Sequence, residues 1–123
     1  MKIMDAISRV DKLYFNTFSV AEKIAWLSKL DMLIQKNILD THEGNKVDFA
    51  GYPADVDVET ELLAPAPFDE MYLHWLQGQM ELALKEIDNY NASILTFNTE
   101  YEAFENWYNR NHMPKQHGRR FVF

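Results

Sequence analysis

The sequence contains no cysteine, and only four glycines and four prolines among its 123 residues. Without thiols the chain has no disulfide scaffold, no thiolate metal site, no iron–sulfur site and no thiol nucleophile. The glycines stand apart from one another, at Gly44, Gly51, Gly78 and Gly118. No glycine-rich loop that could cradle a phosphate group is therefore present.

Long hydrophobic runs are also missing. The longest apolar stretch without a charge, Met71–Met80, is much shorter than the roughly 18 residues that a membrane span requires. The first residues, MKIMDAISRVDK, lack the hydrophobic segment of a secretory signal. A length of 123 residues suits one folding unit, so we expect a single domain over residues 1–123, neither exported nor embedded in a membrane.

Acidic residues outnumber basic ones, 19 against 12, and the formal net charge is −7. The two signs are separated along the chain, because residues 110–123 carry four basic residues and no acid, which leaves a charge of −11 on residues 1–109. An acidic body repels duplex DNA, whose phosphate backbone supplies the dominant attraction in most protein–DNA complexes. Sequence-specific binding of nucleic acid is therefore not expected.

Two amphipathic helices are predicted in the first third of the chain. The first has an apolar face that recurs at helical spacing, formed by Ile3, Ile7, Val10 and Tyr14. The second begins after Ser19, which forms a capping-box pattern with Glu22, and runs to about Leu39. Its apolar face consists of Ile24, Leu27, Leu30, Ile34 and Ile38.

A long acidic loop is predicted over residues 45–66, where proline and glycine interrupt the helical pattern. It could be a functional loop, a disordered arm, or a short strand or turn at 55–63. Its carboxylates alternate with other residues at Asp55, Asp57, Glu59 and Glu61. A calcium loop that began at Asp55 would need glycine and glutamate where Thr60 and Ala66 stand, so we favour a solvated loop over an ion site.

A helical pattern of apolar and aromatic residues continues from Phe68 to Tyr108 without proline and without a break in phase. It predicts one long helix over about residues 67–110, which would measure about 65 Å at about 1.5 Å per residue. Weak helix formers leave a kink near residues 89–93 as the alternative, namely Asn89, Asn91 and Ser93. The predicted fold class is all-α, with short N-terminal helices packed on one long C-terminal helix.

The long helix is rich in aromatic residues, which have two interpretations. Those that face inward would pack in the core of their own chain. Tyrosine and tryptophan are also enriched in protein interfaces, because their rings bury a large area while their polar atoms find partners. The candidates for a contact between copies of the chain are Trp75, Tyr90, Phe97, Tyr101, Phe104, Trp107 and Tyr108.

No arrangement of residues argues for catalysis or for a cofactor. The four histidines, His42, His74, His112 and His117, lack the spacing of a zinc hydrolase helix. His112 and His117 flank Pro114 and could hold a metal only with further ligands. The serines fall in helical or capping positions and not in a glycine-flanked turn. We expect no catalytic residues, no metal and no cofactor.

The last residues, 111–123, form a basic tail that ends in aromatic side chains. Such a tail has two natural fates, because it can fold back on its own acidic body or add an extended segment to a partner. The basic residues would steer it toward an acidic surface in either case. The candidate partner-binding residues are Arg110, Lys115, Arg119, Arg120, Phe121 and Phe123.

Several stretches carry a resemblance to known proteins. They are 26–31 (WLSKLD), 41–44 (THEG), 59–72 (ETELLAPAPFDEMY), the pairs 90–91 (YN) and 97–98 (FN), and 107–114 (WYNRNHMP). These stretches resemble the siphophage head-to-tail connector proteins, also called adaptors, in phages and prophages of Gram-positive bacteria. The resemblance covers most of the chain, and 107–114 is its most specific part.

The resemblance implies a helical virion protein of the head–tail neck that is made in the host cytoplasm. It implies a ring of identical copies, dodecameric in such connectors, with the portal protein on one side and a downstream neck or stopper protein on the other. The tail would reach the portal or a neighbouring copy. The family defines no catalytic residues.

The leading hypothesis is therefore a non-enzymatic connector that forms a ring on the portal. Other phage neck proteins, such as stopper or tail-completion proteins, are alternatives within the same class. An acidic regulator or DNA mimic that binds a nucleic-acid enzyme is the alternative from another class. If the carboxylates of the ring face its lumen, they would line a DNA channel passively, since like charges keep DNA from adhering.

Overall fold

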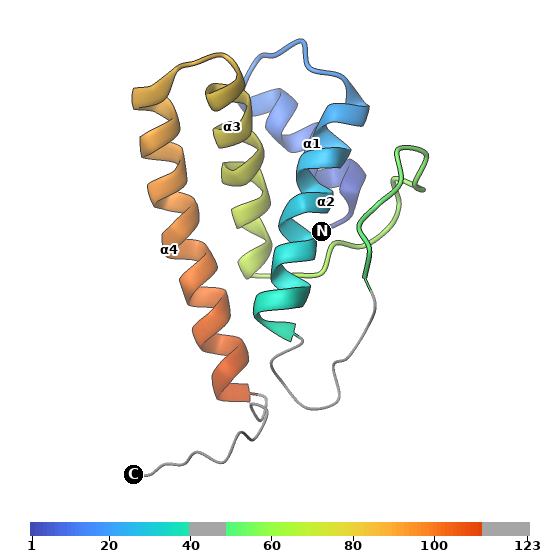
Figure 1. Cartoon of the computed structure of the whole chain (residues 1–123), viewed down its shortest axis with the longest axis vertical. Helices are drawn as coiled ribbons and strands as arrows, with labels where there is room; N and C mark the ends of the chain where they lie inside the picture. The colour runs from blue at the N-terminus through green and yellow to red at the C-terminus, as the bar shows by residue number, and fades with distance from the viewer. Residues whose placement is uncertain (40–48, 112–123) are drawn as a thin grey trace.

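The computed structural model describes residues 1–39 and 49–111, and the regular structure within them is helical (Figure 1). The elements are α1 (Ile3–Leu13), α2 (Val20–Asn37), the short 3-10 helix η2 (Phe68–Glu70), α3 (Met71–Ala83) and α4 (Ile87–Asn111). The described residues contain a single β-bridge, between Lys2 and Glu61, and no strand. The prediction of an all-α fold with a long C-terminal helix on shorter ones is confirmed.

Helices α1 and α2 form where the sequence predicts them. The capping box of α2 is present, because the Ser19 hydroxyl accepts a hydrogen bond from the Glu22 amide at 3.1 Å while the Glu22 carboxylate accepts one from the Ser19 amide at 3.0 Å. All five predicted apolar positions of α2 are buried, namely Ile24, Leu27, Leu30, Ile34 and Ile38.

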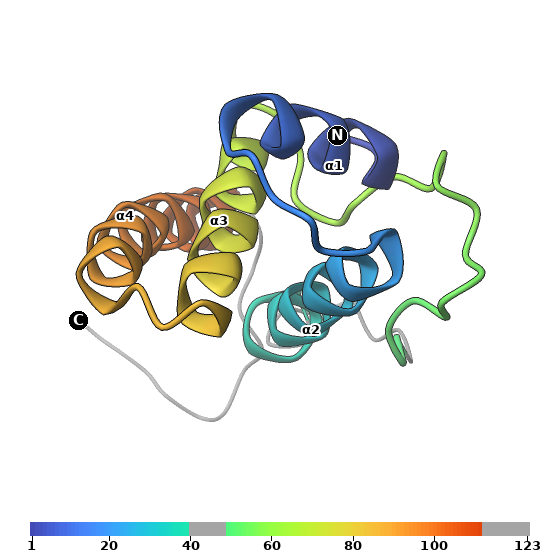
Figure 2. The same ribbon diagram turned by 90° about the horizontal axis from the view of Figure 1, so that it is seen from above.

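Helix α3 lies at the centre of the molecule and packs on α1, α2 and α4 (Figure 2). It coincides with the long uncharged stretch noted in the sequence. Eight of its 13 residues are buried, on all sides of the helix: Met71, Tyr72, Leu73, Trp75, Leu76, Gly78, Met80 and Glu81. A helix whose buried residues point in all directions requires cover on every side.

The prediction of one continuous helix over 67–110 is wrong. The chain reverses at Leu84–Glu86, between α3 and α4, and not near residues 89–93. Lys85 adopts the left-handed conformation with φ of 61°. The Lys85 amide donates to the Leu82 carbonyl at 3.0 Å and the Glu86 amide donates to the Glu81 carbonyl at 2.8 Å, which is the hydrogen-bond pattern of a Schellman helix end.

Packing against α3 explains the reversal. A single straight rod would leave the second half of the helix in water, whereas the turn lays α4 back along α3 and buries Phe97, Phe104 and Tyr108. The buried Ser93 hydroxyl donates to the Glu81 carboxylate of α3 at 2.6 Å. Tertiary contacts therefore stabilise α4 even where its sequence contains weak helix formers. Most protein helices are stabilised in this way.

The acidic loop, in its described part from residue 49 onward, packs against the start of the chain through turns. The Ile3 amide donates to the Thr60 carbonyl at 3.0 Å and the Leu62 amide donates to the Met1 carbonyl at 2.9 Å. The Lys2 ammonium lies 2.9 Å from the Glu59 carboxylate. Turns occur within residues 55–63, as one of the interpretations predicts, and Glu61 adds a β-bridge. Residues 45–48 lie outside the described residues, and a functional loop stays a prediction.

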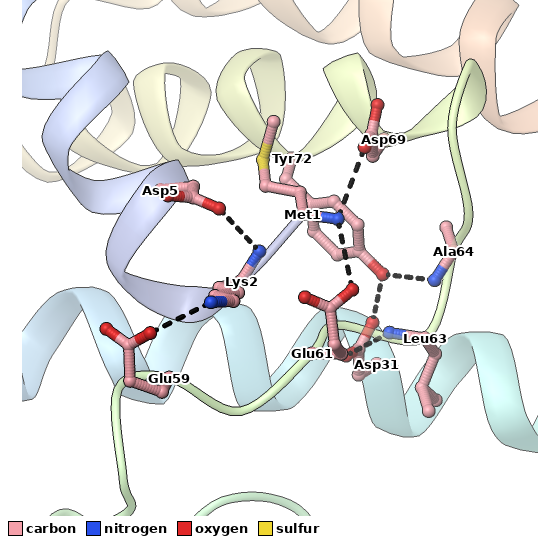
Figure 3. A network of polar contacts seen from close by, with 10 residues as sticks. All are labelled: Met1, Lys2, Asp5, Asp31, Glu59, Glu61, Leu63, Ala64, Asp69 and Tyr72. Carbon is pink, nitrogen blue, oxygen red and sulfur yellow. Dashed lines mark hydrogen bonds and ion pairs between the residues drawn. The ribbon is translucent and has the colours of Figure 1, made fainter.

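A buried carboxylate joins the loop to the helices (Figure 3). Asp31 of α2 is completely buried and accepts hydrogen bonds from the Tyr72 hydroxyl of α3 at 2.6 Å, from the Leu63 amide at 3.1 Å and from the Tyr52 hydroxyl. The Tyr72 hydroxyl in turn accepts a hydrogen bond from the Ala64 amide at 2.8 Å. One side chain therefore connects α2, α3 and two points of the loop.

Burial raises the pKa of the Asp31 carboxyl above its usual value of 3.8, although hydrogen bonds from Tyr52, Tyr72 and the Leu63 amide act in the opposite direction. A carboxyl whose pKa is raised on folding binds its proton more readily in the folded state. Its contribution to stability is therefore complete below the unfolded pKa and is lost as the pH rises through the folded pKa.

We predict that replacement of Lys85 by glycine stabilises the protein by about 0.5–1 kcal/mol, because glycine adopts a positive φ without steric cost. Chemical unfolding monitored by circular dichroism measures the change. Lys85→Ala is the control, since alanine removes the same charge and chain but keeps the steric cost. A Lys85→Gly variant no more stable than Lys85→Ala would contradict the prediction.

We predict a pH effect from the comparison of the wild type with Asp31→Asn. As the pH rises from below 4 to neutral, the wild type should lose stability relative to the variant, which carries no titrating group at this position. Urea unfolding at a series of pH values provides the measurement. A relative gain for the wild type would show that the hydrogen bonds of Asp31 outweigh its desolvation.

Candidate interaction surfaces

Four of the seven aromatic residues predicted to join copies of the chain lie in its own core, namely Trp75, Phe97, Phe104 and Tyr108. The rings of Trp75 and Phe97 are 5.1 Å apart, and the Trp75 indole donates a hydrogen bond to the Trp26 carbonyl at 2.8 Å. These residues therefore pack between the helices of their own chain. We therefore no longer assign them to a contact between copies.

The other three, Tyr90, Tyr101 and Trp107, are half-buried. Trp107 packs on Phe68 of η2 with ring centres 5.2 Å apart. Part of each of these three side chains remains accessible, so they stay candidates for the margin of an interface.

The predicted partner-binding residues fall mostly beyond the described part of the chain. Arg110 is exposed in the last turn of α4, at the end from which the tail begins. The others lie outside the described residues: Lys115, Arg119, Arg120, Phe121 and Phe123. The structure therefore shows where the tail begins, whereas the surface that the tail binds stays a prediction.

The side of α4 that faces away from α3 carries an unusual surface. No charged residue occurs from Asn89 to Thr99, which is three turns of helix. We call the exposed residues within this stretch the outer face of α4; they are Asn89, Asn91, Ala92, Leu95, Thr96, Asn98 and Thr99. Leu95 at its centre is 68% exposed.

The composition of the outer face is not explained by helix formation. Asparagine and threonine are weak helix formers, and solvent-exposed helix faces usually carry charged residues. The hydroxyl groups of Thr96 and Thr99 donate to the carbonyls of Ala92 and Leu95, at 3.3 and 3.2 Å, so both hydroxyls already have a partner within the helix. A small, uncharged surface of this kind suits close contact with another protein surface.

A second feature is an apolar pocket on the opposite side of the molecule, between α1, the start of α2 and the acidic loop. It has a volume of about 230 Å³ and is lined by Met4, Ile7, Ser8, Val20 and Val58. We call it the α1–α2 pocket. Its rim is accessible, because Met4 is 46% and Val20 is 52% exposed.

Many of the described carboxylates take part in contacts within the chain. The ion pairs on the α1 side of the molecule are Lys2 with Glu59, Arg9 with Glu70, and Lys23 with Asp11, at 2.9, 2.7 and 2.8 Å. The amino group of Met1 lies 3.3 Å from Asp69. These basic groups are neutralised locally, so the negative charge that remains comes from carboxylates elsewhere on the surface.

One of the four histidines, His74, lies within the described residues. His74 contacts Glu100 of α4, with 2.7 Å between Nδ1 and Oε1. The other three, His42, His112 and His117, lie outside the described residues. Across 1–39 and 49–111, no group of three or more potential ligands lies close enough to hold a metal ion. None of the helices in those ranges is long and apolar enough to cross a membrane.

Sequence reasoning missed Asp31, the α1–α2 pocket and the outer face of α4. For Asp31 a signal was present, because it lies four residues after Leu27 and three before Ile34, on the buried face of α2. For the outer face the signal was the run of uncharged polar residues, of which Asn89, Asn91 and Ser93 were considered only as grounds for a kink, the alternative to a continuous helix. The pocket depends on contacts between distant segments and has no local signal.

Comparison of the chain with models of protein families, with curated proteins and with solved structures found no match. A function is therefore inferred from the surfaces described above and from the resemblance given by the sequence.

The core assignment of the α4 aromatics predicts a large loss of stability on their truncation. Phe104→Ala, at a position 1% exposed, should lower the free energy of unfolding by about 3–5 kcal/mol. Phe15→Ala, at a position 91% exposed, is the matched control and should change it by about 0.5 kcal/mol or less. Equal effects of the two substitutions in denaturant unfolding would contradict the assignment.

Proposed function

We propose that this protein is a non-enzymatic structural connector of a phage virion, which assembles as a ring of identical copies on the portal at the head–tail junction. The tail, residues 111–123, latches each copy to a neighbouring subunit. The proposal combines the sequence resemblance to siphophage head-to-tail connectors with the two surfaces of the fold.

The observation that carries the proposal is the outer face of α4. A monomer gains nothing in solubility or in helix stability from three uncharged turns with Leu95 exposed at their centre. A lateral contact with another copy would bury these side chains without the cost of removing a charge from water.

The arrangement of the helices is compatible with a ring. Helix α4 forms one edge of the molecule and packs on α3 and η2, whereas α1, α2 and the acidic loop form the other edge (Figure 2). Two different edges meet in a head-to-tail contact, which closes into a ring when the rotation between copies is suitable. The outer face of α4 would then contact the α1–α2 edge of the next copy.

The acidic-regulator alternative has less support from the described surface. A DNA mimic requires exposed carboxylates spread along its binding face, but α4 carries none from residue 89 to 99. Several carboxylates near α1 are paired with basic groups of the same chain, including Glu59 and Glu70. Other neck proteins, such as stopper or tail-completion proteins, remain the alternative within the virion.

We predict that Leu95→Asp prevents the formation of rings on the portal, because it places a charge in the centre of the lateral contact. Leu84→Asp is the control, since Leu84 is 51% exposed and lies in the turn between α3 and α4, outside both proposed contact surfaces. Each purified variant is mixed with the portal and imaged by electron microscopy, with circular dichroism to confirm the helical fold. We expect at least about a tenfold loss of rings for Leu95→Asp, because the substitution weakens every lateral contact of the ring.

Two outcomes would contradict the proposal. Rings that form normally with Leu95→Asp would remove α4 from the lateral contact. Absence of rings for the wild type together with the portal would remove the connector function itself.

A further inference from the structure

The α1–α2 pocket has no partner within the described chain, and its size suits an aromatic ring. Its walls are formed by Met4, Ile7, Val20 and Val58, with the hydroxyl of Ser8 as the polar group. The volume of about 230 Å³ exceeds the roughly 150 Å³ of an engineered apolar cavity that accommodates benzene. Methionine in the wall adapts its shape to an inserted group.

Carboxylates stand close in the sequence to two residues of the pocket: Asp57 and Glu59 flank Val58, and Glu22 follows shortly after Val20. The basic residue next to Ser8, Arg9, is paired with Glu70, and Glu59 is paired with Lys2. Within the described residues neither Asp57 nor Glu22 takes part in an ion pair, although the Glu22 carboxylate accepts hydrogen bonds from Ser19. A ligand for this site should therefore combine an apolar ring with positive charge next to it.

The chain itself contains such a segment. Its last five residues, 119–123, are RRFVF, in which two arginines precede two phenylalanines. In an extended segment Phe121 and Phe123 point to the same side, because side chains alternate along a strand. One ring can then enter a pocket while the arginines remain near Asp57 and Glu22.

The position of α4 indicates which copy receives the tail. The tail begins after Asn111 at the end of α4, and α4 packs on α3 and η2 at the edge opposite the pocket (Figure 2). The twelve residues 112–123 can span up to about 40 Å when extended, at about 3.3 Å per residue. To reach the pocket of its own chain, the tail would have to pass around α3 and the helices that cover it. In the proposed ring, the pocket instead belongs to the edge of the next copy that contacts α4.

We propose that the C-terminal segment 119–123 of one copy binds the α1–α2 pocket of a second copy, with a phenylalanine ring in the pocket and the arginines beside Asp57 and Glu22. The inference rests on the proposed ring, and it names the partner of the tail as the next subunit. It also assigns Met4, Ser8 and Val58 to the receiving site.

Disulfide trapping tests the contact cleanly because the natural sequence has no cysteine. Full-length protein with Ser8→Cys is mixed with full-length protein with Val122→Cys, which retains both phenylalanines, and is oxidised without the portal. The control partner is Ala83→Cys, an exposed small residue at the end of α3. We expect about tenfold more mixed disulfide with Ser8→Cys than with Ala83→Cys, since binding raises the effective concentration of the two thiols.

Further variants define the result. Replacement of Phe121 and Phe123 by serine in the Val122→Cys chain should reduce the yield to the control level. Equal yields for Ser8→Cys and Ala83→Cys would overturn the proposal. So would a chain with both Ser8→Cys and Val122→Cys that closes on itself at a rate independent of concentration, because the tail would then occupy its own pocket.

The failure of this inference is distinguishable from that of the proposed function. The trapping experiment contains no portal, and the imaging of rings contains no engineered cysteine. Loss of trapping with wild-type rings still present would remove only the tail–pocket contact. Trapping without rings on the portal would retain the contact between copies and reject the connector function.

Discussion

The fold follows from the need to cover α3. Its buried residues, most of them apolar, point in all directions from the helix axis, so an arrangement that leaves one side in water would be unstable. Helices α1 and α2 cover part of its circumference and α4 covers another part. The chain reverses after Ala83 because the aromatic face of α4 can then cover one side of α3. One continuous helix would leave that side in water.

The carboxylate of Asp31 then determines where the acidic loop lies. A buried charge is costly unless its hydrogen bonds are complete, and here the donors are Tyr52, Tyr72 and the Leu63 amide. Two of these three donors belong to the loop, so an incorrectly placed loop would leave the carboxylate without partners. Val58, which lines the α1–α2 pocket, lies between Tyr52 and Leu63 in the sequence. The loop is therefore fixed to Asp31 both before and after Val58.

Local sequence signals were sufficient for α1 and α2, where an apolar period and the Ser19 capping box coincide with the observed helices. They were insufficient at the α3–α4 turn, because Leu84, Lys85 and Glu86 are good helix formers and neither glycine nor proline marks the break. The turn is imposed by packing between residues far apart in the chain. The same limit applies to the candidate surfaces, since exposure of Leu95 is known only once α3 covers the opposite side of α4.

The antiparallel packing of α3 and α4 has a mechanical consequence. Force applied to the C-terminal end of α4 along the helix axis acts parallel to the α3–α4 interface and not perpendicular to it. Contacts such as Trp75 with Phe97 and Ser93 with Glu81 are then loaded together in shear, instead of being broken one after another as in peeling. A helix hairpin pulled along this axis resists a higher load before it yields. In the proposed ring, this resistance would keep the fold intact when the tail is under tension.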